Sequence, residues 1–293
     1  MKSTYIALLV ASAIAASTIV ATDAAAQRAA PDTLGRIKAA KQINVAFSGD
    51  SLPFSFVGEG NRPAGYSIDL CARVIAQIGR AIGEPSLNVN WIVGTVSERL
   101  AMIASGKADL ECANTTETQT RLKDVDFSNL VFVDGGGFLV KVSASINRFP
   151  DLAGKRIGVI AGTTTEQRLR AVVKERLASN TTVVTVREAP EGLAMLEAGS
   201  LDAFASDKVK LVGLGAQAKD PNAFQLLGED LSYEPYAFAL PRGDSALRLE
   251  VNKALTQVYV TGEIEPIFQK WLGKIGRPSG LLAAMYLLNA IPD

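Results

Sequence analysis

Small polar side chains follow a predicted β-strand over residues 109–113. Asn114, Thr115 and Thr116 come directly after it, and Arg121 stands five residues further on. Hydroxyl and amide groups beside an arginine suit a carboxylate, because a guanidinium can donate two parallel hydrogen bonds to it. Asn and Thr are also ordinary turn residues, so a turn with a surface arginine is the alternative interpretation.

A second polar turn, Gly162-Thr163-Thr164-Thr165-Glu166, follows a predicted strand over residues 156–161. Thr163 and Glu166 match a capping box, which indicates a helix start. The free amides and the positive end of such a helix attract an anion, although plain capping explains the same residues. No Gly-Lys-Ser/Thr follows, so the turn is not a phosphate loop.

Two charged residues stand at the ends of predicted elements, one after a strand and one in the first turn of a helix. Asp207 closes a predicted strand over residues 202–206, where its carboxylate either meets an ammonium group or caps a helix. Arg99 lies in the first turn of a helix that we expect Ser97 to cap, and a cation there opposes the helix dipole. Such departures from local rules are enriched at functional sites, but a solvent-facing arginine is the simpler interpretation.

The composition narrows the chemistry. The chain has 293 residues, 30 basic and 30 acidic side chains, and no histidine. Balanced charge gives no reason to expect a nucleic-acid partner. Without histidine, Ser-His-Asp and Cys-His catalysis and the commonest metal ligand are excluded. We therefore expect no catalytic residue, no metal site and no cofactor.

The N-terminus predicts export. Lys2 precedes an apolar run over residues 6–21, and Ala24-Ala25-Ala26 reads as a cleavage site. A membrane anchor is the alternative, but it needs about 20 apolar residues. Residues 1–26 are therefore predicted to be a signal peptide, cleaved near Ala26. In an oxidising compartment Cys71 and Cys112 either form a disulfide or remain as buried thiols.

Strands and helices alternate in two units. The first has strands at 43–47, 89–93 and 109–113, with helices from Ser67 to about Arg80 and from Ser97 to near Gly106. The second has strands at 156–161, 181–186 and 202–206, with helices between them. A strand at 233–240 leads back to a helical tail. This rhythm is typical of two α/β units with mostly parallel sheets, rather than of one long sheet.

Several ordered segments together resemble a known family. They are Pro53-Phe54-Ser55-Phe56, Gly65-Tyr66-Ser67-Ile68-Asp69, Thr95-Val96-Ser97-Glu98-Arg99, Asp109-Leu110-Glu111-Cys112-Ala113-Asn114-Thr115-Thr116, Arg121, Asp126-Phe127-Ser128, Gly162-Thr163-Thr164 and Lys270-Trp271. The set resembles the amino-acid-binding proteins of bacterial ABC importers, solute-binding family 3, and is most similar to the glutamate/aspartate branch.

The resemblance implies an α/β, two-lobed periplasmic binding protein of type II with two hinge-crossing strands. It assigns residues 27–136 and 238–293 to the first lobe and residues 137–237 to the second. It also implies a periplasmic protein that works as a monomer, binds a free amino acid and delivers it to an inner-membrane ABC transporter permease. We expect a binding protein and not an enzyme.

The resemblance also implies the roles of single residues. Arg121 matches the arginine that grips the ligand α-carboxylate, and Asp207 matches the acid that holds the ammonium. The other matching positions are Asn114 and Thr116 at the ammonium and carboxylate, Thr163 and Thr164 over the carboxylate, Tyr236 near the hinge and Arg99 at the ligand side chain.

Two departures bear on the ligand. An arginine commonly follows the first strand in the glutamate/aspartate branch, but Ser48 stands there, and the histidine that reads the acidic side chain is missing. Arg99 is then the remaining candidate cation, and glutamate or aspartate is the expected ligand, with a neutral polar amino acid as runner-up. Cyclohexadienyl (prephenate/arogenate) dehydratases are similar to this family and supply the alternative, in which an acid such as Glu111 serves as a general acid.

Overall fold

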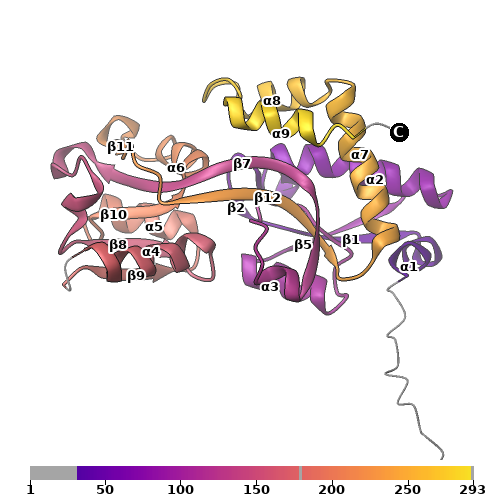
Figure 1. Cartoon of the computed structure of the whole chain (residues 1–293), viewed down its shortest axis with the longest axis horizontal. Helices are drawn as coiled ribbons and strands as arrows, with labels where there is room; N and C mark the ends of the chain where they lie inside the picture. The colour runs from indigo at the N-terminus through magenta and orange to yellow at the C-terminus, as the bar shows by residue number, and fades with distance from the viewer. Residues whose placement is uncertain (1–31, 178–179, 292–293) are drawn as a thin grey trace, which may run out of the picture.

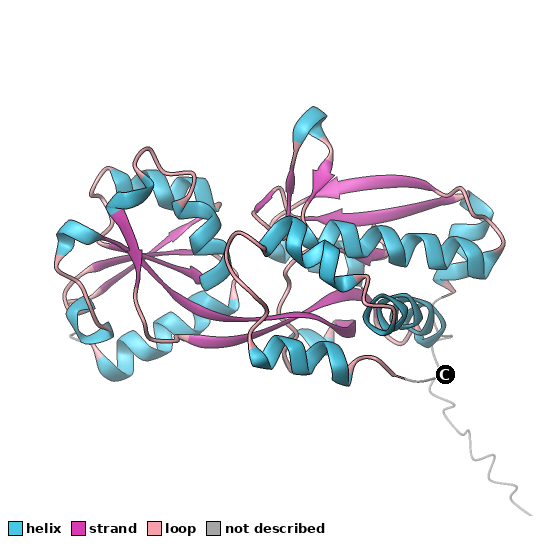
Figure 2. Cartoon of the chain, turned by 90° about the horizontal axis from the view of Figure 1, so that it is seen from above, coloured by secondary structure: helices cyan, strands magenta, loops and turns pink. Residues whose placement is uncertain are grey.

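The computed structural model describes residues 32–177 and 180–291 of the chain (Figure 1). The predicted signal peptide, residues 1–26, lies outside the described residues. Two α/β lobes lie side by side, and two long strands run from one to the other (Figures 1 and 2). Among the described residues, no helix is both long enough and apolar enough to cross a membrane.

The first lobe contains both ends of the described chain. Its helices are α1 (Thr33–Ala40), α2 (Tyr66–Ile82), α3 (Val96–Ala104), α7 (Ser245–Val260), α8 (Ile264–Leu272) and α9 (Gly280–Leu288). Its strands are β1 (Gln42–Phe47), β5 (Asn88–Val93) and β6 (Leu110–Glu111), together with the small sheet β2 (Asp50–Ser51), β3 (Ser55–Val57) and β4 (Pro63–Ala64). Both β5 and β6 pair with β1 in parallel.

The second lobe repeats this plan. It contains β8 (Arg156–Ile160), α4 (Thr164–Arg176), β9 (Thr182–Val186), α5 (Ala189–Glu197), β10 (Ala203–Asp207), α6 (Lys208–Gly215) and β11 (Phe224–Leu226). Parallel pairing joins β10 to β8 and β8 to β9. The predicted strand–helix rhythm of both units is therefore observed, and the expected α/β class is correct.

The two crossing strands are β7 (Val125–Lys141) and β12 (Ser232–Pro241), which pair antiparallel. They link the lobes into one hydrogen-bonded path of strands in the order β5-β1-β6-β12-β7-β10-β8-β9. The expectation of two separate sheets is corrected here. The sequence signal missed β7 because Gly135, Gly136 and Gly137 interrupt its alternation of apolar and polar residues, although they stay paired with neighbouring strands.

Each lobe has its own hydrophobic core. One buried cluster reaches from Ile37 to Met285 and includes Val133 and Tyr236, whereas the other lobe is built around residues such as Phe138 and Phe204. The core changes between Val133 and Phe138 within β7, and again between Leu231 and Tyr236 where β12 begins.

The starts of two helices differ from expectation. Gly65, at φ 130°, is the N-cap of α2, and Ser67 lies inside the helix. A side chain at position 65 would collide with the carbonyl of Phe54, so this turn requires glycine. Thr95, not Ser97, caps α3, and Thr95 and Glu98 form a complete capping box. At α3 the sequence offers two hydroxyl residues, Thr95 and Ser97, and local propensity does not choose between them.

Two of the family-like segments meet in the first lobe. Asp69 Oδ2 accepts hydrogen bonds from Lys270 Nζ and from Trp271 Nε1, each at 2.7 Å. This contact joins α2 to α8, although Asp69 and Lys270 are 201 positions apart in the chain. These residues therefore build the scaffold and do not contact the cavity described below.

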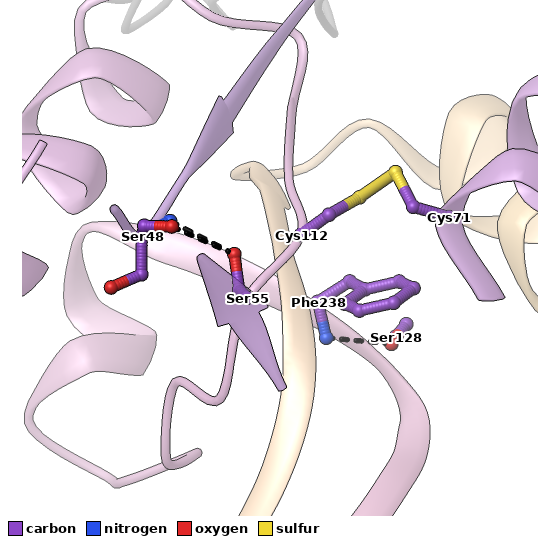
Figure 3. Close-up of a disulfide and its surroundings, with 6 residues drawn as sticks. All are labelled: Ser48, Ser55, Cys71, Cys112, Ser128 and Phe238. Carbon is purple, nitrogen blue, oxygen red and sulfur yellow. Dashed lines mark hydrogen bonds between the residues drawn. A yellow bond between two sulfur atoms is a disulfide. The ribbon is translucent and has the colours of Figure 1, made fainter. Parts of the chain in front are cut away.

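A disulfide joins Cys71 of α2 to Cys112, which follows β6 (Figure 3). The two Cα atoms lie 6.0 Å apart, and both residues are fully buried in the first-lobe core. Near the disulfide, Ser48 N donates to Ser55 Oγ and Phe238 N donates to Ser128 Oγ, each at 3.0 Å (Figure 3). Cys112 stands two residues before Asn114, so the cross-link anchors the segment that carries the first predicted binding residues.

Removing the cross-link should destabilise the protein without changing its fold. The bond closes a span of 41 residues, and the loss of chain entropy in the unfolded state then contributes about 4 kcal/mol. We expect the Cys71→Ala/Cys112→Ala variant to unfold at a lower guanidinium concentration while keeping its circular dichroism spectrum. Reduced wild-type protein is the control, because it keeps both sulfur atoms in the core. An unchanged midpoint in both samples would contradict the prediction.

Candidate functional site

A cavity of about 570 Å³ lies between the two lobes. It is mostly lined by residues that follow strands or begin helices. The sequence-predicted residues on its wall are Arg99, Asn114, Thr116, Arg121, Thr163, Thr164 and Asp207. Ser48, Asp50, Thr165, Ser206 and Lys210 also line it. The carboxyl ends of the strands of both lobes therefore meet at one polar site.

Arg121 begins a short 3₁₀ turn, Arg121–Lys123, in the first lobe. Its Nη1 donates to Thr116 O at 2.6 Å, which fixes the direction of the guanidinium. Burial lowers its pKa, while the nearby carboxylates of Glu111 and Glu234 oppose that shift. Within residues 32–177 and 180–291 no carboxylate lies within 4.0 Å of this cation. Arg121 is thus positioned to receive an anion.

Asp207 stands at the N-cap position of α6, but its side chain makes no capping bond. Its two oxygens instead accept hydrogen bonds from Asn114 Nδ2 at 3.1 Å and from Thr165 Oγ1 at 3.3 Å. Asp134 of β7 takes over the capping and accepts from Val209 N at 3.1 Å. Of the two interpretations of Asp207, the geometry favours the cavity-facing carboxylate over the helix cap.

Two threonines from opposite lobes share one acid. Thr116 Oγ1 and Thr164 Oγ1 donate to Glu234 Oε2, at 2.6 and 2.7 Å. Thr163 accepts from Glu166 N and so caps α4, as the plain capping interpretation predicted. Because Glu234 belongs to crossing strand β12, these bonds bring both lobes together at the hinge.

Further contacts close the lobes over the cavity. Asp50 Oδ2 of the first lobe accepts from Ala189 N of the second at 2.9 Å. At the rim, Arg187 lies 3.5 Å from Glu98. A small molecule in this cavity would be enclosed by both lobes, which excludes water and strengthens its polar contacts.

Arg99 lines the cavity, as expected, but it is already paired. Its Nε lies 2.7 Å from Glu111 Oε1, and its Nη1 donates to Gly94 O at 2.7 Å. Both members of the pair are buried, Arg99 at 4% and Glu111 at 0% exposure. Glu111 therefore compensates the charge of Arg99 and also relieves the cost of placing a cation in the first turn of α3.

Tyr236, which we expect near the ligand, is not among the residues that line the cavity. Its ring is fully buried and packs against Phe54 and Phe132, and its hydroxyl lies 3.4 Å from Asp134 Oδ2. Burial raises its pKa well above the ordinary value, so the hydroxyl stays protonated. This side chain therefore belongs to the first-lobe core.

Lys210 is one of several cavity residues that the sequence did not single out, and it is a buried cation. It lies in the first turn of α6, three residues after Asp207, and is 9% exposed. Residues three apart share one face of a helix. Recognising α6 after Asp207 would therefore have pointed to Lys210, but α6 is short and mixes two lysines and two glycines with its valines and leucines.

Three acids gather where the strands cross: Asp134, Asp207 and Glu234. Burial raises the pKa of Asp134 to about 7, and the Asp207 carboxylate adds to this against opposing bonds from Gly135, Val209 and Tyr236. Burial and Asp207 also raise the pKa of Glu234. Among the described residues no cluster of three or more acids or cysteines is arranged to hold a metal ion.

Two lobes, two crossing strands and an enclosed polar cavity define a two-lobed binding protein of the periplasmic type II class. The chain belongs to the bacterial extracellular solute-binding proteins, family 3, whose family model matches residues 43–274. Both the fold class and the resemblance inferred from sequence are thereby confirmed.

Relatives of known function are similar over most of the chain. The L-glutamate/L-aspartate-binding protein of Pseudomonas aeruginosa is 35% identical, covering 85% of this chain and 82% of the relative. The glutamate/aspartate import solute-binding protein of Escherichia coli (strain K12) is 31% identical, covering 90% and 86%. A solved structure of the ancestral amino acid-binding protein AncCDT-1, a precursor of cyclohexadienyl dehydratase, is 27% identical with a TM-score of 0.69, covering 82% and 98%.

The buried acid at the hinge should make stability depend on pH. In the unfolded chain the pKa of Asp134 is about 3.9, whereas the folded protein holds its proton up to a pKa of about 7. Between these values the folded state binds more protons than the unfolded one, so the free energy of unfolding falls as pH rises, by up to about 1.4 kcal/mol per pH unit for one proton.

Asp134→Asn should therefore flatten the fall in unfolding free energy between pH 5 and pH 7.5, measured by denaturant titration, by about the slope of one proton. Asp202→Asn is the matched control. The hydrogen bond from Arg156 lowers the pKa of Asp202, so its contribution is lost below the unfolded value, outside this range. Equal slopes in the wild type and Asp134→Asn would contradict the prediction.

Proposed function

We propose that this protein is the periplasmic substrate-binding subunit of an ABC amino-acid importer and binds an acidic L-amino acid between its lobes. The observation that carries the proposal is the pair of opposite charges in the cavity. Arg121 offers a guanidinium that has no carboxylate within 4.0 Å in the described part of the chain, and Asp207 offers a buried carboxylate from the other lobe. An amino acid carries the complementary charges on adjacent atoms.

The proposed binding mode follows from these positions. Arg121 grips the α-carboxylate, and the backbone amides at the N-terminus of α4 assist it. Thr116, Thr163 and Thr164 line the same cavity and hold its walls in place through their hydroxyls. Asp207 and Asn114 hold the ammonium group. Because the groups come from both lobes, the ligand stabilises the closed arrangement and presents it to the permease.

Similarity to glutamate/aspartate-binding relatives supports the acidic ligand and the importer. It also supports the periplasmic location, the partnership with an inner-membrane permease and the absence of enzymatic activity. The protein is proposed to act as a monomer, since one chain supplies both walls of the cavity.

The dehydratase alternative has weaker support. It used Glu111 as a general acid, but Glu111 is fully buried, pairs with Arg99 and is not among the residues that line the cavity. A general acid must reach the atom that it protonates. Incubation with prephenate or arogenate, followed by product absorbance, tests this alternative directly.

A thermal-shift screen against the twenty amino acids tests the proposed function. The protein should first be unfolded, dialysed and refolded to remove any ligand carried through purification. A ligand at 100 times its dissociation constant adds about 2.7 kcal/mol of stability. We expect glutamate or aspartate to raise the melting temperature most. If no amino acid raises it, the proposal fails.

Replacing Arg121 should remove binding without unfolding the protein. Arg121→Met deletes one side of a charged pair, which costs about 2–5 kcal/mol, or about 30-fold or more in affinity. Arg121→Lys should bind with intermediate affinity, because an ammonium cannot donate two parallel bonds. Calorimetry with the best ligand measures these values. The control is Arg187→Met, since Arg187 lines the cavity with a side chain that is 70% exposed; normal binding by Arg121→Met would refute its role.

A further inference from the structure

The cavity contains more charge than the α-carboxylate and ammonium of an amino acid require. Four cations besides Arg121 line it: Arg99, Lys107, Arg187 and Lys210. Arg99 is neutralised by Glu111, and Arg187 lies at the exposed rim beside Glu98. Lys107 is exposed. Lys210 alone of these four is both buried and, across the described ranges 32–177 and 180–291, more than 4.0 Å from every carboxylate.

The acid beside Lys210 is already occupied. Asp50 Oδ1 accepts from Ser48 Oγ at 3.0 Å, and Asp50 Oδ2 accepts from Ala189 N at 2.9 Å. Burial raises the pKa of Asp50, but the charge of Lys210 and the bond from Ala189 outweigh it and leave that pKa below its ordinary value. Lys210 therefore stands at the Ser48–Asp50 end of the cavity, and its ammonium keeps its donors available.

A buried ammonium without a hydrogen-bonded anion is costly, so the cavity is poised for an anion at that end. Half-buried Arg121 in the first lobe and buried Lys210 in the second are two cations of one cavity, and Asp207 is its buried acid. Asp50 also lines the cavity, but its two oxygens accept from Ser48 and Ala189. An acidic amino acid carries two carboxylates and one ammonium. The arrangement of charges thus matches a dicarboxylate better than a neutral amino acid.

We propose that Lys210 is the specificity-determining residue of this site, and that its Nζ donates to the side-chain carboxylate of an acidic amino acid. The proposal rests on the proposed function and adds the group that distinguishes glutamate or aspartate from their amides. Arg99 forms an ion pair with Glu111, so its charge is compensated and it is not the cation that selects the ligand.

The test compares glutamate with glutamine, which differ only at the side-chain end. Calorimetry on wild type and Lys210→Met should show glutamate affinity falling about 30-fold or more, whereas glutamine affinity changes by less than about fivefold. Lys210→Arg, which keeps the charge, should keep the preference for glutamate. Aspartate and asparagine provide a second, shorter pair with the same expected contrast.

Lys107→Met is the matched control, because it removes one lysine charge from the exposed part of the same cavity. It should change both affinities by less than about fivefold. Melting curves without ligand establish that each variant is folded before binding is measured.

The outcomes separate two failures. If the wild type binds no amino acid, the proposed function fails. If the wild type binds amino acids but Lys210→Met lowers the affinities for glutamate and glutamine equally, the assignment of Lys210 is overturned while amino-acid binding stands. The same holds if Lys210→Met changes neither affinity. A wild type that prefers glutamine to glutamate overturns it as well.

Discussion

A carboxylate that is shielded from water needs hydrogen bonds, and Glu234 obtains them from both lobes at once. Thr116 brings the first lobe to this acid, and Thr164 brings the second. Opening the lobes would remove at least one of these donors from a buried charge. The closed arrangement therefore depends on this shared acceptor, which lies on a strand that belongs to neither lobe alone.

The same principle accounts for the division of work among the other buried charges. Asp134 caps α6, and this leaves the Asp207 side chain free to face the cavity. Glu111 compensates Arg99, and Asp50 is held by Ser48 and Ala189. Among residues 32–177 and 180–291, Arg121 on one wall and Lys210 on the other have no carboxylate within 4.0 Å, although Asp50 lies close enough to Lys210 for the pKa of Asp50 to be lowered. Selectivity in this view is set by which charges the scaffold leaves unpaired, and not by how many it contains.

Much of the fold could be predicted because its signals are local. Alternating apolar residues and helical stripes indicated the three parallel strands of each unit and most of the helices, and turn residues marked the strand ends where Asn114, Thr163 and Asp207 stand. The long strand β7 escaped because three glycines lack side chains to show alternation. The short helix α6 escaped because it mixes lysines and glycines with its valines and leucines, and Lys210 was missed with it.

The sequence by itself determined the α/β class, the polar residues at the strand ends and the family, since propensity, pattern and ordered motifs are properties of neighbouring residues. Only the tertiary structure decided which charges are paired. Glu111 reaches Arg99 across 12 positions, Asp134 caps a helix that starts more than 70 positions later, and Tyr236 turns into the core instead of the cavity. The physical reason is that the interaction energy of a charged group depends on its burial and on its distance from other charges. Where those charges lie on segments far apart in the chain, both quantities are set only once the two crossing strands have brought the lobes together.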